Sequence, residues 1–326
     1  MTPLLEVEDL RVHFGGGTQA VRGVSLVVNR GETHCLVGES GCGKSVSALA
    51  VMNLLARGAV RSAGRLAFAG ADMRGWSERQ MARLRGDKMA MIFQEPMTSL
   101  NPAYTVGSQM AEVRRRHRGG SQAEALERAA ALLEKVGITA PGLRLAQYPH
   151  QLSGGLRQRV MIAMALMCDP ELLLADEPTT ALDVTVQAQI LRLLLELQRE
   201  LGLAMLLITH DLGVVARMAH RVSVMYAGRV VEHATAADLF AAPTHPYTRG
   251  LLDCVPVPGR TRPDGRLGSI PGTVPRITAG FTGCGFRARC AHAMPACAGD
   301  LPWQARGEGH GYECVLPADW PAKVAA

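Results

Sequence analysis

A short glycine-rich segment lies between an apolar run and a stretch with helical spacing, and it restricts the fold more than any other feature. His34-Cys35-Leu36-Val37 predicts a short buried strand, and Val46 to Leu55 predicts a helix. Between them the pattern G-x-x-x-x-G-K-S/T is matched by Gly38-Glu39-Ser40-Gly41-Cys42-Gly43-Lys44-Ser45. A strand, a glycine loop and a helix in this order predict a phosphate-binding loop, and this context disfavours a chance glycine-rich turn.

Each residue type in this loop suits a triphosphate. Glycines let the backbone approach the phosphates, and the N–H groups at the start of the following helix meet their negative charge. The Lys44 ammonium group can reach the β- and γ-phosphates, and the Ser45 hydroxyl can ligate Mg²⁺. We therefore expect residues 38–46, which end at Val46, to bind ATP or a similar nucleotide together with Mg²⁺.

The rest of the sequence predicts an α/β fold. Roughly the first ninety residues indicate short strands separated by turns, and residues 98–149 indicate helices. After them the patterns alternate: a helix over Val160–Met167, a strand over Glu171–Ala175, a helix over Thr185–Glu200 and a strand over Ala204–Thr209. Strands that alternate with helices form a largely parallel sheet that is covered on both faces.

The composition excludes several classes of protein. Of 326 residues, 48% are hydrophobic and 20% are charged, which is typical of a globular protein and not of a disordered one. No apolar run approaches the ~18 residues of a membrane-spanning helix, and Met1–Leu10 carries acids in place of a signal core. The net charge is +6, but the basic run Arg114–Arg118 lacks interleaved aromatic residues and indicates a solvated helix end. We expect a soluble cytosolic protein that binds no nucleic acid.

Two adjacent carboxylates follow the strand predicted at residues 171–175. Asp176 and Glu177 lie at its carboxyl end, where open α/β sheets bind their ligands. Alone, such a pair is usually a strand end that turns into solvent. Beside a phosphate loop the two can divide the work of hydrolysis, because Asp176 can hold the metal shell while Glu177 polarises the attacking water.

A third glycine segment, Leu152-Ser153-Gly154-Gly155-Leu156, precedes the helix predicted at Val160. A serine and two glycines at a helix start can bind phosphate through backbone N–H groups and the Ser153 hydroxyl. Taken alone, a plain N-cap is the simpler explanation. Together with the two earlier motifs, the segment resembles the LSGGQ signature of the ATP-binding cassette (ABC) ATPases.

The resemblance to ABC ATPases covers roughly residues 1–250, with further motifs in the expected order. Gln94, in Ile92-Phe93-Gln94-Glu95-Pro96, resembles the Q-loop glutamine that contacts metal and water. Thr180-Ala181-Leu182-Asp183 resembles the D-loop, and His210 resembles the switch histidine that contacts the γ-phosphate. Phe14 is similar to the aromatic residue that stacks on adenine, with His13 as the rival position.

This resemblance implies an ATPase whose sites are each built from two subunits. The residues that would act catalytically on the chain's own ATP are Lys44, Gln94, Glu177 and His210. The implied Mg²⁺ ligands are Ser45, Gln94 and Asp176. Ser153, Gly154 and Gly155 would close over the partner's nucleotide, and Asp183 is counted among the nucleotide-binding residues.

Two positions depart from the family pattern. Leu156 stands where the signature has glutamine, so any side-chain hydrogen bond from that position is missing. Cys42 stands where the loop often has serine. The helix N-terminus could stabilise the Cys42 thiolate and make it an oxidation target, but a small tolerated residue is the simpler explanation.

Half of the eight cysteines lie near the end of the chain, at Cys284, Cys290, Cys297 and Cys314. Buried free thiols are one explanation, and disulfides are disfavoured in the cytosol. Four thiolates also suit structural zinc, although the usual C-x₂₋₄-C pairing is missing, or an iron–sulfur cluster, which tolerates varied spacing. The residues alone leave zinc and iron–sulfur open.

The segment Gly283–Cys297, with His245-Pro246-Tyr247-Thr248 upstream, resembles the C-terminal extension of the oligopeptide/dipeptide importer ATPases. Some members of that subfamily carry a 4Fe–4S cluster here, so the resemblance implies such a cluster on the four cysteines, with zinc as the alternative. The implied domains are an ABC ATPase domain over residues 1–252, with a helical subdomain at about 96–160, and the extension over 253–326.

The resemblance also implies partners and a location. Such a chain would pair with a second, related ATPase subunit and work with two transmembrane permease subunits. Its segment Glu95–Val106 would receive a coupling helix from the permease. It would work with an extracytoplasmic substrate-binding protein, at the cytoplasmic face of the inner membrane, and import di- or oligopeptides. Two alternatives stay open: the same ATPase importing nickel or another small solute, and a soluble ABC ATPase acting on nucleic acid or ribosomes. The second predicts tandem cassettes or long coiled-coil insertions, which the sequence lacks.

Overall fold

The computed structural model describes residues 2–94, 99–180, 182–256, 268–318 and 320. The chain divides into two compact units, each assembled from separate stretches of sequence. Unit 1 comprises residues 1–4, 28–32 and 75–207, and unit 2 comprises residues 5–27, 33–74 and 208–326.

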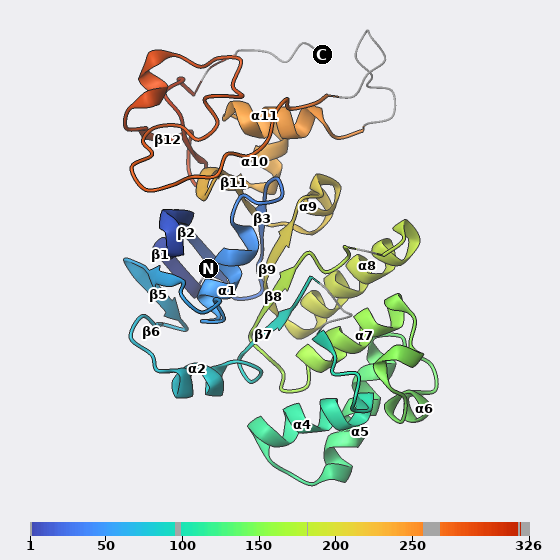
Figure 1. The fold of residues 1–326 in the computed structure, drawn as a ribbon. Helices are drawn as coiled ribbons and strands as arrows, with labels where there is room; N and C mark the ends of the chain where they lie inside the picture. Colours follow the sequence, from blue (N-terminus) through green and yellow to red (C-terminus); the bar gives the residue numbers. More distant parts are fainter. Residues whose placement is uncertain (1, 95–98, 181, 257–267, 319, 321–326) are drawn as a thin grey trace. The chain divides into compact units, whose positions relative to one another are not determined.

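An antiparallel sheet forms the N-terminal part of unit 2, with strand order β2-β1-β5-β6 and β4 paired to β1 (Figure 1). Its strands are β1 (Pro3–Phe14), β2 (Thr18–Asn29), β4 (Val60–Ser62), β5 (Arg65–Phe68) and β6 (Ala71–Asp72). The first two are 12 residues long, so the expectation of short strands is wrong here. They are joined by the single 3-10 turn η1 (Gly15–Gly17), where the glycines supply positive φ angles.

A second set of strands in unit 2 begins with β3 (Thr33–Val37), which pairs in parallel with β10 (Arg221–Tyr226). All five residues of β3 are buried, as expected for a parallel strand covered on both faces. Next come β11 (Arg229–Thr235), β13 (Gly311–Glu313) and β12 (Trp303–Ala305), all antiparallel. The C-terminal extension therefore contributes strands to the sheet that contains β3.

The helices of unit 2 are short. They are α1 (Lys44–Val51), α9 (Leu212–Met218), α10 (Ala236–Ala241), α11 (Pro246–Asp253) and the 3-10 helix η3 (Pro295–Ala298). The first of them follows β3 directly, so the predicted strand, loop and helix are present around residues 38–45.

Unit 1 has neighbouring strands β7 (Met89–Ile92), β8 (Leu172–Asp176) and most of β9 (Ala204–Thr209), with β7 and β8 parallel. Its helices are α2 (Glu78–Leu84), α4 (Val106–Arg118), α5 (Gln122–Lys135), α6 (Pro141–Leu145), η2 (Pro149–Gln151), α7 (Gly154–Ala165) and α8 (Val184–Leu201). Figure 1 shows α4 to α7 gathered into one helical group.

Side-chain caps explain where several helices of unit 1 begin. Ser121 and Glu124 form a capping box at the start of α5. The Ser153 hydroxyl accepts a hydrogen bond from the Leu156 N–H, so α7 begins at Gly154, six residues earlier than predicted. The end of α8 is marked by Gly202, which has a positive φ angle.

The basic run at the end of α4 contacts segments that are distant in sequence. Arg118 donates a hydrogen bond to the Cys168 backbone oxygen (2.8 Å) and forms an ion pair with Asp87 (2.9 Å). Arg114 donates to the Met167 oxygen. These bonds attach the end of α4 to the segment that follows α7, so these arginines have a structural role.

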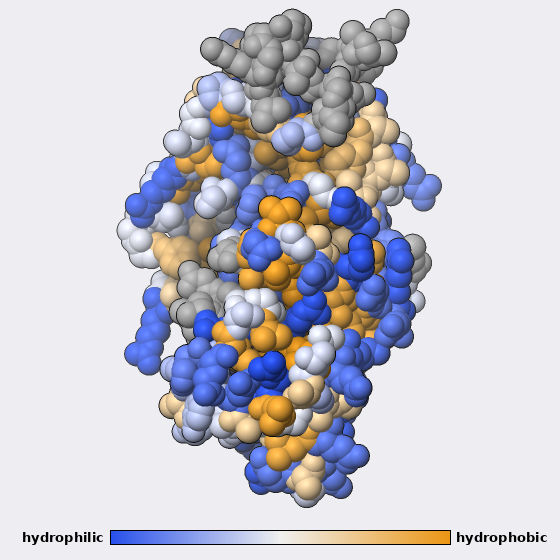
Figure 2. Space-filling view, turned by 90° about the vertical axis from the view of Figure 1, so that its right-hand side faces the viewer, coloured by the Kyte–Doolittle hydropathy of each residue, from blue (hydrophilic) through white to orange (hydrophobic). Residues whose placement is uncertain are grey.

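No helix in the part of the chain that the structure describes has both the length and the apolar character needed to cross a membrane. The face drawn in Figure 2 mixes hydrophilic and hydrophobic residues.

Candidate functional site

The glycine loop between β3 and α1 has a backbone that requires its glycines. Gly38 has φ +152° and Gly43 has φ +106°, a region that residues with a Cβ atom rarely adopt. A Cβ atom on Gly38 would overlap the backbone oxygen of Met225, and one on Gly43 would overlap that of Ala20. Only glycine fits at both positions, so the motif is a structural requirement of this loop.

Lys44 is the charged residue of the loop, and it is 4% exposed. Its Nζ atom donates hydrogen bonds to the backbone oxygens of Gly38 (2.8 Å) and Glu39 (3.0 Å). Lys44 thus braces the loop from inside, at the start of α1, where backbone N–H groups can bind an anion. Cys42 is 1% exposed, and burial raises the pKa of its thiol, so the structure favours the small-residue interpretation over a reactive thiolate.

The remaining predicted residues of unit 2 lie at strand ends. His210 is exposed and directly follows β9, and the next residue, Asp211, caps α9 by accepting the Gly213 N–H at 2.7 Å. Phe14 is half-buried at the end of β1, and its rival His13 precedes it on the same strand.

In unit 1, the two predicted carboxylates lie at the end of β8. Asp176 is 5% exposed and ends the strand. Glu177 has φ +44°, a strained conformation for a residue with a side chain. Its carboxylate accepts hydrogen bonds from Gln94 Nε2 (3.0 Å) and Thr180 Oγ1 (2.9 Å). The structure therefore brings the Q-loop glutamine to the proposed catalytic base.

The predicted signature and D-loop residues of unit 1 lie at the starts of two helices. Ser153, Gly154 and Gly155 form the N-terminus of α7. Asp183 accepts the Val186 N–H at 3.0 Å and caps α8. Ala181 of the D-loop, and residues 95–98 of the segment expected to contact the permease, lie outside the described residues.

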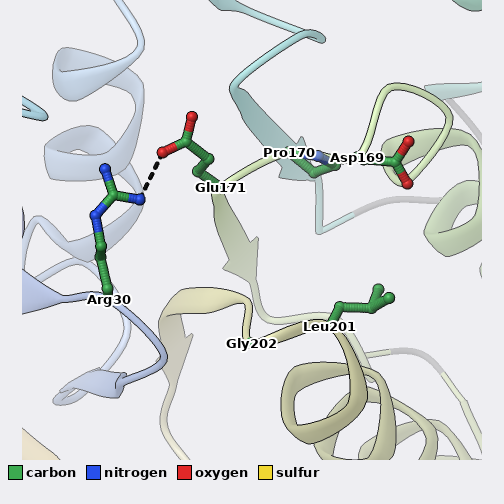
Figure 3. A pocket seen from close by; sticks show the side chains of 6 residues that line it. All are labelled: Arg30, Asp169, Pro170, Glu171, Leu201 and Gly202. Carbon is green, nitrogen blue, oxygen red and sulfur yellow. Dashed lines mark hydrogen bonds and ion pairs between the residues drawn. The ribbon is translucent and has the colours of Figure 1, made fainter.

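A separate hollow of about 300 Å³ in unit 1 lies at the opposite end of β8 (Figure 3). Glu171, which precedes β8, pairs there with Arg30 at 2.6 Å. The other residues that line the hollow are Asp169, Pro170, Leu201 and Gly202. Because Asp176 and Glu177 lie at the carboxyl end of β8, this hollow holds neither of the predicted catalytic carboxylates.

None of the four cysteines of the extension forms a disulfide. Cys284, Cys297 and Cys314 are buried, and Cys290 is half-buried. Burial, with a smaller contribution from the other three cysteines, raises the pKa of Cys284 to about 11. Within the described residues, however, no three Cys, His, Asp or Glu side chains are grouped as a metal ion requires. For the part of the chain that it describes, the structure therefore gives no support to a bound cluster.

Sequence reasoning missed several buried polar residues that connect the extension to the rest of unit 2. Glu232 on β11 is fully buried and bonds to His310 of the extension at 2.8 Å. Arg289 of the extension pairs with Glu39 of the glycine loop at 2.9 Å. Tyr247 of the motif His245-Pro246-Tyr247-Thr248, which precedes the extension, accepts the Glu39 N–H at 2.9 Å. In the sequence, this motif indicated that the extension is present, but it did not reveal which residues the extension contacts.

Comparisons with known proteins match this chain to two family models. Residues 21–180 match the family model of the ABC transporter, and residues 231–297 match that of the oligopeptide/dipeptide transporter C-terminal region. The "Probable peptide ABC transporter ATP-binding protein y4tR" of Sinorhizobium fredii is 54% identical over 303 residues, covering 92% of this chain and 90% of that protein. This chain belongs to the ATP-binding subunits of the oligopeptide/dipeptide ABC transporter family.

Other family members match over nearly the whole chain. The dipeptide transport ATP-binding protein DppD of Escherichia coli is 49% identical over 320 residues, 97% of each chain. Among solved structures, an ATP-binding cassette named MJ0796, a dimer bound to ADP and Pi, covers 72% of this chain and 99% of that one, with TM-score 0.64 and 27% identity. The cbiO1 protein from Clostridium perfringens gives a TM-score of 0.63 at 29% identity, over 74% of this chain and 92% of that one. The predicted ABC ATPase fold is thereby confirmed.

Proposed function

We propose that this ABC ATPase hydrolyses ATP to drive the import of di- or oligopeptides through a separate permease. The observation that carries the proposal is the 49% identity to dipeptide transport ATP-binding proteins, which extends through the C-terminal region as well as the cassette. Import of nickel or another small solute by the same ATPase remains the alternative cargo, since the described residues supply no contact with cargo.

The proposed nucleotide residues follow the motifs. Residues 38–46 hold the phosphates, Phe14 stacks on adenine, and His210 contacts the γ-phosphate. Asp183 is proposed to belong to the same nucleotide site, and Ser153 with its two glycines to close over the nucleotide of a partner subunit. This proposal is supported by the helix N-termini at Lys44 and Gly154, which present backbone N–H groups of the kind that bind phosphates.

The proposed magnesium ligands are Ser45, Gln94 and Asp176, with the phosphates of ATP completing the shell. Hydroxyl, amide and carboxylate oxygens are hard donors, which is the type that Mg²⁺ prefers. When bound, the ion offsets charge on the β- and γ-phosphates. Asp176 is 5% exposed at the end of β8, so its surroundings restrict the positions that its carboxylate can take.

The proposed hydrolysis is positioning chemistry. Glu177 accepts a proton from the attacking water, whose oxygen bonds to the γ-phosphorus while the bond to the ADP oxygen breaks. Gln94 and Thr180 fix the Glu177 carboxylate by their hydrogen bonds, so the base is oriented and loses little entropy during the reaction. Lys44 stabilises negative charge on the transferred group.

The proposed assembly has four kinds of component: this chain, a second related ATPase, two permease subunits and an extracytoplasmic substrate-binding protein. The chain would lie at the cytoplasmic face of the inner membrane, bound to the permease. The cassette MJ0796, solved as a dimer, supports the pairing of two ATPase chains. We further propose the domain limits given above, with the ATPase domain over residues 1–252 and the extension over 253–326.

The variant Glu177→Gln tests this function. It should bind ATP as the parent does but lose ATP hydrolysis by at least about 100-fold, because general base catalysis contributes roughly that much. The matched control is Glu200→Gln, which removes an exposed carboxylate paired with Lys135 and should hydrolyse ATP normally. ATPase assays of the purified protein measure both. Hydrolysis by Glu177→Gln within tenfold of the parent would contradict the role of Glu177.

A metal on the extension is a separate proposal. Cys284, Cys290, Cys297 and Cys314 supply four free thiols from one segment, the number that a 4Fe–4S cluster or a structural zinc ion requires. Anaerobic purification followed by iron, sulfide and zinc analysis distinguishes the two. Iron and sulfide near four per chain, lost in Cys284→Ser, would support the cluster. About one zinc per chain would support zinc, and protein without either metal would overturn both.

A further inference from the structure

The glycine loop and the C-terminal extension meet at one ion pair within unit 2. The Arg289 Nη1 atom lies 2.9 Å from one carboxylate oxygen of Glu39 and 3.1 Å from the other. The Arg289 side chain is 6% exposed and that of Glu39 is 28% exposed. This pair is therefore largely shielded from water, unlike a surface ion pair.

Arg289 is fixed from several directions. Its Nε atom donates to the Pro271 oxygen at 2.7 Å, and its Nη2 atom donates to the Ile270 oxygen at 3.1 Å. Nη1 also donates to the Tyr226 hydroxyl at 3.2 Å. A planar guanidinium held by this many acceptors has little freedom, so it presents a fixed positive charge to Glu39.

Glu39 is held through its backbone as well as its side chain. Its N–H donates to the Tyr247 hydroxyl at 2.9 Å, and its carbonyl oxygen accepts from Lys44 Nζ at 3.0 Å. The Tyr247 ring packs edge-on against that of Tyr226, with ring centroids 4.6 Å apart. A displaced Glu39 would therefore move an oxygen that helps to position Lys44.

The extension makes a second, independent contact close to Phe14. The Gln19 N–H donates to the Ile277 oxygen, and the Ala279 N–H donates to the Gly17 oxygen, both at 3.0 Å. These bonds attach residues 276–279 to the turn and strand that directly follow Phe14. The extension thus contacts the glycine loop and the turn that follows Phe14, next to two of the parts of unit 2 that are proposed to hold ATP.

We propose that Arg289 is a positioning residue for ATP, which acts through Glu39 on the glycine loop. This inference rests on the proposed binding of ATP by residues 38–46. Arg289 neutralises a carboxylate that would otherwise face a triphosphate, and it keeps the loop in the conformation that Lys44 braces. The affinity for ATP consequently depends on a residue of the extension that lies 250 positions after Glu39 in the sequence.

The test is equilibrium binding of ATP with Mg²⁺ to the full-length protein, by calorimetry. Arg289→Met should weaken binding about tenfold, which corresponds to ~1.4 kcal/mol. Arg289→Lys keeps the positive charge but loses the planar set of guanidinium donors, so it should weaken ATP binding only about threefold. The matched control is Arg287→Met, because Arg287 contacts Phe281 and Thr282 of the extension itself and should bind ATP within about twofold of the parent.

A double variant separates positioning from a merely structural role. In Arg289→Met with Glu39→Gln, the unpaired carboxylate is gone, so binding should recover to within about threefold of the parent. A purely structural role for Arg289 predicts no recovery. Parent-like binding by Arg289→Met, or a double variant no better than the single one, would overturn the inference. Should Arg289→Met not fold, parent-like binding by Arg289→Lys would overturn it equally.

Lys44→Ala separates failure of this inference from failure of the proposed site. If Lys44→Ala loses ATP while Arg289→Met binds it normally, the site stands and the inference fails. If Lys44→Ala binds ATP normally, the proposed site itself is wrong.

Discussion

The buried carboxylate of Glu232 gives the sharpest prediction of stability. Glu232 is 0% exposed on β11, and its two oxygens accept hydrogen bonds from His310 Nε2 (2.8 Å), the Thr244 N–H (2.7 Å) and the His245 N–H (2.8 Å). His310 belongs to the extension, next to the strand β13 that pairs with β11. Glu232 therefore attaches the extension to the sheet from inside.

The substitution Glu232→Gln keeps the shape and changes the hydrogen bonding. If the amide oxygen keeps the bonds to His310 and Thr244, the amide nitrogen faces the His245 N–H, and that buried donor is left unsatisfied at a cost of about 1–3 kcal/mol. The two remaining bonds lose their charge assistance, about 1 kcal/mol each. Relief from burying a charge offsets part of this. We expect a net loss of about 2–4 kcal/mol in the free energy of unfolding.

Thermal unfolding measures this loss. For a chain of this size about 2 °C accompanies each kcal/mol, so the midpoint should fall by about 4–8 °C. Limited proteolysis should cut the extension of Glu232→Gln sooner than that of the parent. The control is Glu308→Gln, an exposed carboxylate two residues from His310, whose midpoint should match the parent. Equal midpoints for the two variants would refute the reasoning.

The same carboxylate predicts a pH dependence. Burial raises the pKa of Glu232, but the hydrogen bonds from His310, His245 and Thr244 outweigh burial and leave the pKa below its ordinary value of 4.5. A carboxyl group with a lowered pKa stabilises the folded state above its unfolded pKa, and this stabilisation is lost as the pH falls through the folded pKa. The midpoints of the parent and Glu232→Gln should therefore differ fully above pH 4.5 and converge below it.

Two further substitutions test the glycine loop and a helix cap. Gly38→Ala should weaken ATP binding by at least about tenfold, because φ +152° and the Met225 oxygen leave no room for a Cβ atom. Calorimetry measures this affinity. The control is Gly75→Ala, which should bind ATP as the parent does, because a Cβ atom at Gly75 meets no other atom. Asp183→Ala removes the side chain that accepts the Val186 N–H, so it should lower the free energy of unfolding by about 1 kcal/mol. Urea unfolding measures this loss as a lower midpoint. An unchanged midpoint would show that α8 needs no cap at this position.

Short-range patterns predicted much of the fold and of the candidate site. The run at residues 204–209 gave a strand with the predicted bounds, and the helix predicted at 185–200 is found at Val184–Leu201. These predictions succeed because periodicity and caps act between residues a few positions apart. The start of α7 differs from the prediction at Val160, because the Ser153 cap begins the helix at Gly154, ahead of the apolar run. The lengths of β1 and β2 were also wrong, because a glycine turn ends a strand without showing how far it extends.

Long-range pairs could not be predicted in the same way. Arg289 and Glu39 are 250 residues apart, and Glu232 and His310 are 78 residues apart. Arginine, glutamate and histidine are common residues, and Arg289, Glu232 and His310 belong to no motif. Glu39 lies within the glycine-loop motif, but at a position where the pattern allows any residue. Which arginine meets which carboxylate depends on how distant segments pack.

The sequence by itself determined the nucleotide chemistry, because glycine, lysine, serine and paired acids at fixed spacing permit few alternatives. Only the tertiary structure decided that the extension joins the sheet of β3 through β13 and reaches the glycine loop through Arg289. The physical reason is that backbone conformation and helix caps are local. A buried charge, in contrast, is stable only beside a partner that folding brings to it.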